Sequence, residues 1–553
     1  MLNKAIFRRQ LAPLACAGAF LVTFGNWRLA EALALTALVF IACLLAAYFF
    51  TGLYGSDDIS YANILVALRS DTDFSPWASR WLVSLPYALF GQLFGLNPFW
   101  AVSIASIEYV LLVLCSVILA RKLCSPWSAL GAGFLVASCP LVLIYSGALL
   151  PDNILAIVIL AQIFCALEAY EATTEWKLQR WSLLTGAMQA LAYTVKEPAL
   201  IFCVAGPVLL IALALRDLRY ALKAAAAMAC GFAIIFVLDL AIGAILFDNP
   251  FARFVGAELT FDKARERMLQ RDGAYPLERI GKAAQFLSKS WSVGGVGIGP
   301  AFVPISILAP IIHFFPHFRQ FGLILVSTTL SSMTLYHLAG SISLTEYIGV
   351  PLQVRYLAPA AVLLIILAVT IVDRILQLIS AEWRVIGGAA ALFLGIMFGC
   401  LSVYAAAPSA GQIYYYSLVQ EFLTSYSVLR KRQPKVPIYA GPTVTKRILD
   451  YGLVHDVLPV LRLKGATKET QSPFLVLMTK QEGNPVEAGV LPDSVFDVRE
   501  LNAEEHGIFT WIDRAAALKA VFGWRDPAAM IPLQDLLIFE LRPAGRSGAS
   551  ARP

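Results

Sequence analysis

Two adjacent carboxylates stand directly after the first long apolar run of the chain. Asp57 and Asp58 lie in the stretch GSDDISYANI, which follows AAYFFTGLY. Neighbouring acids repel each other and favour water, so the pair fits either a solvated loop or a site that uses negative charge. Adjacent aspartates also bind Mg²⁺ or Mn²⁺, although the spacing supplies no third ligand.

Four more ionisable residues lie beside other apolar runs, where a charge is costly and often functional. Asp152 occurs in SGALLPDNIL, Lys196 and Glu197 in YTVKEPALI, and Arg355 in PLQVRYLAP. With the orientation derived below, they gather with the aspartate pair on one side of the membrane. A proton or ion pathway would instead place carboxylates at several depths. We therefore predict a site at one surface, where the lysine and the arginine meet a lipid-borne anion and an aspartate of the pair does the chemistry.

Each of these residues also has a structural interpretation. Asp152 is suited to cap a helix that begins at Asn153. Lys196 is long enough to extend its ammonium to the interface, or it pairs with Glu197. Arg355 fits equally well as a loop cation.

The composition identifies an integral membrane protein. Of the 553 residues, 59% are hydrophobic and only 14% are charged. The mean hydropathy is +0.71, far above that of soluble domains. The formal net charge of +6 does not suggest binding to nucleic acid, and what matters is where the cations fall along the chain.

Eleven apolar segments are predicted to cross the membrane. Each is expected to be a helix, because every backbone N–H and C=O group in lipid must be hydrogen-bonded within the protein. The run from Leu11 to Phe24 is short for a span, so we favour an interfacial helix there and keep a twelfth span as the alternative. Glu108 and Asp239 fall inside the second and seventh segments, where we expect them to be structural partners. The segments lie near residues 30–52, 99–120, 127–146, 152–170, 182–195, 199–215, 224–247, 299–315, 321–338, 357–373 and 386–405.

Alternate short loops concentrate the basic residues, which sets the orientation by the positive-inside rule. The opposite loops are then external, and so is the chain after residue 405. The aspartate pair and its four charged companions fall on that external side. The loops predicted to be cytoplasmic carry Arg121, Lys122, Lys177, Arg180, Arg216, Arg219, Lys223, Arg319, Arg374 and Arg384, together with Lys4, Arg8, Arg9 and Arg28 near the N-terminus.

The chain divides into four predicted parts. The aromatic and charged residues of segments 75–95 and 250–291 are typical of helices that lie in the interface. Residues 1–28 form a basic interfacial segment or an extra span, 29–405 a transmembrane domain with external loops 53–98 and 248–298, 406–541 an external domain, and 542–553 a disordered tail.

The C-terminal part changes in composition. VPIYAG (436–441), FLVLMT (474–479) and LLIFEL (536–541) are predicted to be short strands, and TVTKRILDYGL an amphipathic helix between the first two. This alternation predicts a small α/β domain.

Several short motifs, taken in order, resemble those of the polytopic GT-C glycosyltransferases. The likeness is strongest to the protein O-mannosyltransferase and aminoarabinose transferase branch. The motifs are GSDDISY, RWLVSLPYALFGQLFGLNPFWAV, ARKL, SGALLPDNIL and YTVKEPALI, and they cover roughly residues 30 to 215. The resemblance implies a mainly α, GT-C-like polytopic membrane fold; the middle of the chain agrees only in topology, and the C-terminal domain offers no motif.

The resemblance implies transfer of a sugar from a polyprenyl-phosphate carrier to an acceptor hydroxyl of a glycan, lipid or protein at the external face, with inversion. Asp57 would be the general base, since partial desolvation beside a like charge raises the proton affinity of a carboxylate. Lys196 would hold the carrier phosphate, assisted by Arg355. Asp58 stands where many relatives have Glu and would orient the acceptor or a metal ion.

The same resemblance assigns Asp152, Glu197, Tyr61 and Arg80 to the donor site. Glu197 departs from the family pattern, in which Gly commonly follows the lysine. No cofactor is implied with certainty, and a divalent cation, Mg²⁺ or Mn²⁺, at the aspartate pair stays open. A bacterial inner membrane with a periplasmic site fits best, and an archaeal or endoplasmic reticulum membrane is the alternative.

Two other functions remain open. A transporter or flippase of a lipid-linked or anionic substrate would use similar helices around a central cavity, and Pro198, Pro304 and Pro310 are suited to broken helices. In the other alternative the C-terminal domain is catalytic and the helices only anchor it, although eleven spans are more than an anchor needs.

Overall fold

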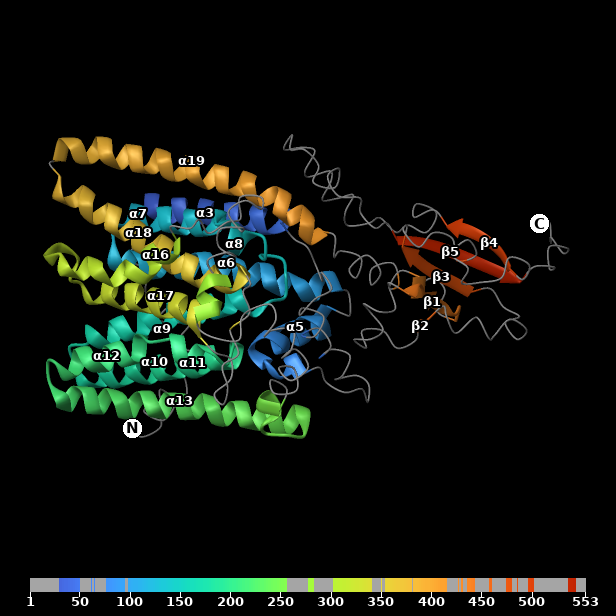
Figure 1. Cartoon of the computed structure of the whole chain (residues 1–553), viewed down its shortest axis with the longest axis horizontal. Coiled ribbons are helices and arrows are strands. Elements are labelled where there is room, and N and C mark those ends of the chain that lie inside the picture. Colours follow the sequence, from blue (N-terminus) through green and yellow to red (C-terminus); the bar gives the residue numbers. More distant parts are fainter. Residues whose placement is uncertain are drawn as a thin grey trace, which may run out of the picture.

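The chain folds mainly into helices (Figure 1). The computed structural model describes residues 29–49, 61, 64, 76–94, 98–255, 277–282, 302–340, 350, 354–379, 381–414, 426, 429–430, 435–442, 457–459, 474–479, 485, 496–501 and 536–543. The helices are α3 (Leu29–Tyr48), α5 (Trp81–Phe94), α6 (Pro98–Leu123), α7 (Pro126–Ser138), α8 (Pro140–Leu143), α9 (Pro151–Tyr170), α10 (Glu175–Val195), α11 (Ala199–Phe202), α12 (Ala205–Ala214), α13 (Leu218–Phe247), α16 (Phe302–Leu308), α17 (Phe321–Ala339), α18 (Ala358–Leu378) and α19 (Ala381–Tyr414), with 3₁₀ turns η2 (Pro76–Ser79), η3 (Ala309–Phe314), η4 (Pro316–Phe318) and η5 (Val354–Leu357).

Helices occupy all eleven segments that the sequence predicted to cross. In the described part, six helices are long and apolar enough to span a membrane. The predicted polytopic, mainly α membrane fold is therefore confirmed, while the number of crossings stays a prediction. The six are Leu29–Ala47, Ser103–Leu123, Pro151–Tyr170, Leu218–Phe247, Phe321–Ala339 and Arg355–Leu378, and the shorter apolar helices are Ala199–Ala214, Phe302–Phe314 and Gly387–Val403.

Three predicted segments are broken rather than continuous, and a proline lies at or shortly after each break. Pro140 separates α7 from α8, because proline has no N–H to donate and keeps the preceding residue out of the helical region. Pro207 lies in the first turn of α12, where its missing donor is not needed. Pro310 lies where α16 tightens into η3.

The loops that carry the basic residues meet at one end of the helical bundle. Lys122, at the end of α6, forms an ion pair with Glu168 near the end of α9. Arg374 of α18 donates to the Leu123 carbonyl at 3.2 Å. The basic loops therefore lie at one end of the bundle and the opposite loops at the other, as the sequence predicted. The compartment that each end faces stays a prediction.

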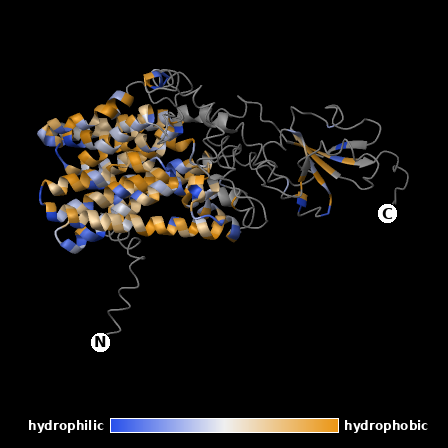
Figure 2. Cartoon of the chain, turned by 60° about the horizontal axis from the view of Figure 1, so that its bottom comes forward, coloured by the Kyte–Doolittle hydropathy of each residue, from blue (hydrophilic) through white to orange (hydrophobic). Residues whose placement is uncertain are grey.

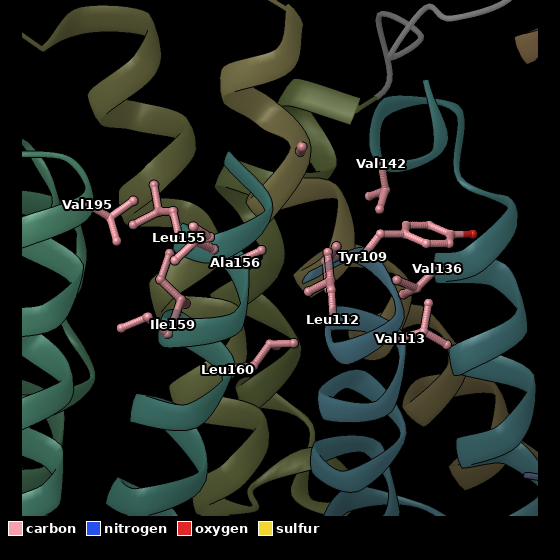
Figure 3. Close-up of a cluster of buried hydrophobic side chains, with 14 of the residues drawn as sticks. Tyr109, Leu112, Val113, Val136, Val142, Leu155, Ala156, Ile159, Leu160 and Val195 are labelled. Carbon is pink, nitrogen blue, oxygen red and sulfur yellow. The ribbon is translucent and has the colours of Figure 1, made fainter. Parts of the chain in front are cut away.

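The bundle core lies between α6, α7 and α9, and Figure 3 shows part of it. Leu112 of α6 and Ile159 of α9 are almost wholly buried there, as is Val136 of α7. The buried Tyr109 phenol donates to the Ala137 carbonyl at 2.6 Å, so its hydroxyl is satisfied. This apolar packing holds the helix ends that carry the ionisable residues.

The outer helices consist largely of hydrophobic residues (Figure 2). Val237 and Ile245 of α13 are 62% and 77% exposed, and Phe393 of α19 is 66% exposed. A water-soluble protein rarely leaves such continuous apolar surface uncovered. These faces are suited to contact with lipid.

The C-terminal part contains a five-stranded sheet with the strand order β2-β1-β3-β5-β4. Strand β1 runs parallel to β2 and β3, and β5 runs antiparallel to β3 and β4. The sheet lies beyond the end of the bundle that carries α5 (Figure 1). Its strands are β1 (Ile438–Ala440), β2 (Val457–Pro459), β3 (Phe474–Thr479), β4 (Phe496–Leu501) and β5 (Leu536–Pro543).

The three strands predicted from the sequence are confirmed as β1, β3 and β5. The sequence analysis missed the two edge strands, because β2 has only three residues and β4 carries charges in FDVREL. Edge strands commonly have short or charged sequences, which weakens the apolar pattern. The predicted helix TVTKRILDYGL lies outside the described residues, and the domain boundaries stay predictions.

Several other predictions also fall wholly or partly outside the described residues. They include the segment 1–28, the aspartates Asp57 and Asp58, and most of 250–291. Segment 75–95 is helical as predicted, in η2 and α5. Its position in the interface stays a prediction.

Helices α10 and α13 pack closely because each presents a glycine to the other. A Cβ added to Gly186 would lie 2.0 Å from the Met228 carbonyl oxygen, and one added to Gly231 would lie 1.9 Å from that of Leu183. Such small residues let helix backbones approach in a membrane. This contact fixes α10, which carries Lys196 at its end, against α13.

We expect Gly186→Ala and Gly231→Ala to lower the free energy of unfolding by about 1–3 kcal/mol, because the added methyl must displace a backbone carbonyl. Gly131→Ala in α7 is the matched control: its Cβ meets no atom within 4 Å. Alanine there is expected to be neutral or to stabilise the helix by up to about 1 kcal/mol. Thermal unfolding of the purified protein in detergent compares the variants, and equal transition temperatures would contradict the close contact.

Candidate active site

Four residues from three separate segments meet at the end of the bundle opposite the basic loops. The Lys196 Nζ lies 3.4 Å from the Asp152 Oδ1 and 3.1 Å from the centre of the Tyr356 ring. The Arg355 Nε lies 3.9 Å from the other oxygen of Asp152, Oδ2. Two cations thus share one carboxylate, and an aromatic ring supports the lysine.

Helix ends place these side chains. Pro151 is the first residue of α9, which puts Asp152 in the first turn, where the helix dipole favours a carboxylate. Helix α10 ends at Val195 because Pro198 follows, and Lys196 takes an extended conformation with φ −156° and ψ 114°. The prolines of PDN and KEP therefore aim both side chains into the same space.

Asp152 keeps one oxygen without a hydrogen bond. Its side chain is only 2% exposed, and within the described residues Oδ2 receives no hydrogen bond. The Arg355 Nε at 3.9 Å is too distant to donate. A buried acceptor in this state is costly unless a ligand or water satisfies it.

Glu197 lies at the centre of a second set of contacts. Arg80 donates to both of its carboxylate oxygens, at 3.2 Å from Nε and 2.7 Å from Nη2. Arg80 Nη1 also donates to the Tyr61 hydroxyl at 3.0 Å. The side-chain nitrogen of Arg253 lies 3.9 Å from the same carboxylate. This glutamate therefore joins α10 to two segments distant in the sequence.

Asp239 is a structural partner, as the sequence analysis expected. It accepts from Arg253 Nη2 at 2.6 Å and from the Trp81 indole at 2.7 Å. Arg253 also donates to the Ser79 carbonyl at 3.1 Å. These bonds fasten the start of α5 to α13.

The electrostatics of the site favour an anion. Burial lowers the pKa of Lys196 to about 8, and Arg355 and Arg80 add to this effect while Asp152 opposes it. Burial alone would raise the pKa of Glu197, but Arg80 and Arg253 outweigh it and hold that pKa below its usual range. The lysine is thus a desolvated cation that gains from an additional negative partner.

The structure brings together six of the eight residues that the sequence analysis assigned to the site. Asp57 and Asp58 lie outside the described residues. Glu108, expected to be structural, is buried on α6 and takes no part in the contacts above. The six are Tyr61, Arg80, Asp152, Lys196, Glu197 and Arg355.

Sequence reasoning missed Arg253 and Tyr356. A signal for Arg253 was present, because Asp239 inside an apolar helix requires a cation and the stretch PFARF supplies one shortly after α13. Tyr356 directly follows Arg355, but only the fold brings its ring under Lys196.

A carboxylate flanked by two cations is not a metal site, and the described residues hold no group of three His, Cys, Asp or Glu side chains suited to a metal.

Comparisons with known proteins give a similarity to a family model and similarities in fold. Residues 84–252 match the family model described as dolichyl-phosphate-mannose-protein mannosyltransferase. The fold is similar to the crystal structure of ArnT from Cupriavidus metallidurans bound to undecaprenyl phosphate, with a TM-score of 0.51 and 13% identity over 93% of this chain and 98% of that one. The apo structure of the same ArnT has a TM-score of 0.47 and 15% identity over 82% of this chain and 94% of that one. No curated protein matches the chain in sequence.

We expect Asp239→Ala to destabilise the protein by about 3–5 kcal/mol, because it leaves the guanidinium of Arg253 buried without its carboxylate. The control is Glu175→Ala, which breaks an ion pair with Lys223 whose side chains are 56% and 42% exposed. An exposed pair contributes only about 0–1 kcal/mol. Thermal unfolding in detergent measures both, and similar losses would show that the buried pair does not hold α5 to α13.

Proposed function

We propose that the chain is a membrane glycosyltransferase with a GT-C fold that moves a sugar from a polyprenyl-phosphate-linked donor to an acceptor hydroxyl at the external face; the family-model match and the similar fold support this proposal. The observation that carries this proposal is the partly buried Lys196, whose ammonium lies 3.4 Å from Asp152, with Arg355 beside the same carboxylate. A desolvated ammonium of this kind is suited to an anionic ligand. The similar ArnT structure binds undecaprenyl phosphate, an anion of this class carried by a lipid.

The donor phosphate lies between Lys196 and Arg355. Their positive charges come from different segments, so a phosphate that meets both is held from two sides. As the sugar leaves, negative charge grows on the phosphate oxygen, and fixed cations in a water-poor site stabilise that charge strongly. Arg80 and Arg253 are occupied by Glu197 and stay in place as neighbours.

The donor sugar lies beside Asp152. Its Oδ2 is buried and accepts no hydrogen bond within the described part of the chain. A sugar hydroxyl is the kind of donor that satisfies this oxygen, which gives the carboxylate a role in orienting the sugar.

Asp57 is the general base of the proposed reaction. It takes the proton from the acceptor hydroxyl while that oxygen attacks the anomeric carbon from the face opposite the phosphate. The bond between the anomeric carbon and the phosphate oxygen breaks, its electron pair leaves with polyprenyl phosphate, and the sugar configuration is inverted. Asp58 orients the acceptor or a divalent cation, Mg²⁺ or Mn²⁺. Tyr61, four residues after Asp57, is bonded to Arg80 beside Glu197.

The acceptor class, a glycan, lipid or protein, is left open by this proposal. The positive-inside pattern supports an external site, and a bacterial inner membrane with a periplasmic active site is the location we propose. Glycan analysis of a strain that lacks the chain identifies the sugar and the acceptor together.

We expect Asp57→Asn to lower transfer by about 10²–10⁴-fold, because the amide accepts no proton from the acceptor. The assay uses purified protein, a polyprenyl-phosphate sugar and a membrane extract as the acceptor, and follows release of polyprenyl phosphate. Glu171→Gln, at the opposite end of α9, is the control and keeps full activity. Unchanged transfer in Asp57→Asn would remove this residue as the base, and substrate flux across liposomes that survives the same change would favour a transporter.

The pKa of Lys196 predicts a pH dependence. The ammonium is charged below its pKa of about 8, so the charge that binds the donor is lost as the pH rises through that value. We expect kcat/KM for the donor, which reports the free enzyme, to fall above about pH 8. Lys196→Arg keeps its charge because the pKa of arginine is far higher, so its profile is expected to be flat there. A parallel fall in both proteins would assign the titration to another group.

A further inference from the structure

Two glutamine side chains form a chain of hydrogen bonds inside the helical bundle. Gln162 is wholly buried in the middle of α9, where every other residue between Asn153 and Cys165 is apolar. Its amide nitrogen donates to the amide oxygen of Gln189 in α10. The amide nitrogen of Gln189 in turn donates to the Ala199 carbonyl at 3.3 Å. Polar groups inside a membrane helix are costly and often functional, so these linked amides require an explanation.

The bond to Ala199 shows that the chain reverses direction after α10. Ten residues separate Gln189 from Ala199, which is about 15 Å along a continuous helix and more than a glutamine side chain can cover. Ala199, the first residue of α11, must therefore lie back beside α10. Lys196 and Glu197 lie between the two arms of this reversal, where Pro198 prevents the helix from continuing. Gln189 thus joins the two arms behind the residues of the candidate site.

Backbone hydrogen bonds carry this restraint to Lys196. The Ala199 N–H donates to the Lys196 carbonyl at 2.9 Å, and the Lys196 N–H donates to the Ala192 carbonyl at 3.0 Å. The Ala199 carbonyl also accepts from the Cys203 N–H at 3.0 Å, so the glutamine uses the second lone pair of that oxygen. A displacement of Ala199 therefore moves the lysine of the candidate site.

The direction of the amide chain is fixed by its last acceptor. A backbone carbonyl only accepts, so the amide nitrogen of Gln189 must face Ala199 and its oxygen must face Gln162. Gln162 then donates, and its own oxygen is buried and accepts no hydrogen bond within the described residues. An unsatisfied buried acceptor is destabilising, and an apolar residue at position 162 would avoid that cost. The donor end of Gln162 is therefore what this position supplies.

We propose that Gln162 and Gln189 are positioning residues, whose linked amides hold the helix reversal and so keep Lys196 against Asp152 and Tyr356. We call the two glutamines the amide clamp. The proposal rests on the proposed function for the role of the lysine. The amide clamp acts through the backbone of the reversal and not on the substrate. A displacement of about 1 Å in a functional group can cost about 10²-fold in rate, so the clamp affects transfer without taking part in it.

The first test compares Gln189→Met, Gln162→Met and the double variant in the transfer assay. Methionine is similar in length and has no N–H to donate. We expect Gln189→Met to lower kcat/KM for the donor by about 10–100-fold, as loss of a residue that orients a functional group commonly does. Gln162→Met is expected to lower it by a smaller factor, because Gln189 keeps its bond to Ala199 but loses its orientation.

The double variant shows whether the two glutamines act as one unit. It is expected to match Gln189→Met alone, because the chain of amides is already interrupted there. Two losses that multiply would mean independent roles and would overturn the proposal. If Gln189→Met does not fold, Gln162→Met carries the test by itself, and unchanged kcat/KM in that variant counts against the clamp.

Thr185→Val is the matched control on the same helix. Thr185 lies about one turn before Gln189, is wholly buried and donates to the Trp181 carbonyl at 2.9 Å. The change removes a buried hydrogen bond of α10 that does not reach the reversal, so kcat/KM is expected to stay the same. A loss equal to that of Gln189→Met would assign the effect to general destabilisation of α10, and the proposal would be wrong.

A measurement on the lysine itself tests the clamp without any transfer. Competitive acetylation of the purified protein over a range of pH, read by mass spectrometry, gives the midpoint at which the Lys196 amine becomes reactive. Burial, together with Arg355 and Arg80, lowers the pKa of Lys196 to about 8, while Asp152 opposes this effect. In Gln189→Met we expect the midpoint to lie at least about one pH unit higher, because a lysine that leaves this desolvated position regains its ordinary pKa.

Failure of the proposed function therefore looks different from failure of the clamp. If no polyprenyl-phosphate sugar is a substrate of the unmodified protein, the proposed function is wrong, and the acetylation midpoint still tests the clamp. A midpoint that rises in Gln189→Met and stays the same in Thr185→Val supports the clamp. A midpoint that is the same in all three proteins overturns it, whatever the transfer assay gives.

Discussion

The partly buried carboxylate of Glu197 holds the charged end of the bundle together. It binds Arg80 with two hydrogen bonds and has Arg253 within 3.9 Å, and these arginines come from segments that precede α5 and follow α13. Buried charges require opposite partners, so three parts of the chain are fixed relative to one another. The departure from the family pattern at this position has a local explanation, because two arginines compensate the added negative charge.

Lys196 and Glu197 are neighbours in the chain, but their side chains contact different partners. Helix α10 ends before Pro198, and Lys196 has an extended backbone. Its side chain lies against Asp152 and Tyr356 and does not pair with the neighbouring Glu197. Among the described residues, Arg80 and Arg253 lie against the glutamate, whereas the lysine meets Asp152 and the Tyr356 ring. This separation produces an electropositive space from residues that would cancel if they paired.

The position of the chemistry follows from the bilayer. The charged side chains of the candidate site lie at helix ends, whereas the outer faces of α13 and α19 are apolar. A substrate with a phosphate and a long hydrocarbon tail has the same division. Under the proposed function, the phosphate would lie among these charges, and lipid would surround the part of the tail that the protein does not contact.

The sequence by itself determined the class of the protein, the helical segments and the end of the bundle at which the ionisable residues gather. Hydropathy and basic loops follow from the energetics of each segment in lipid, so local composition is sufficient for them. Asp152, Lys196 and Arg355 were identified because a charge beside an apolar run is conspicuous. Only the tertiary structure decided the contacts of this end of the bundle, such as Tyr356 under Lys196 and Arg253 on Asp239. These depend on which helices pack together, as Gly186 and Gly231 allow for α10 and α13, and such contacts between distant segments leave no periodic pattern in the sequence.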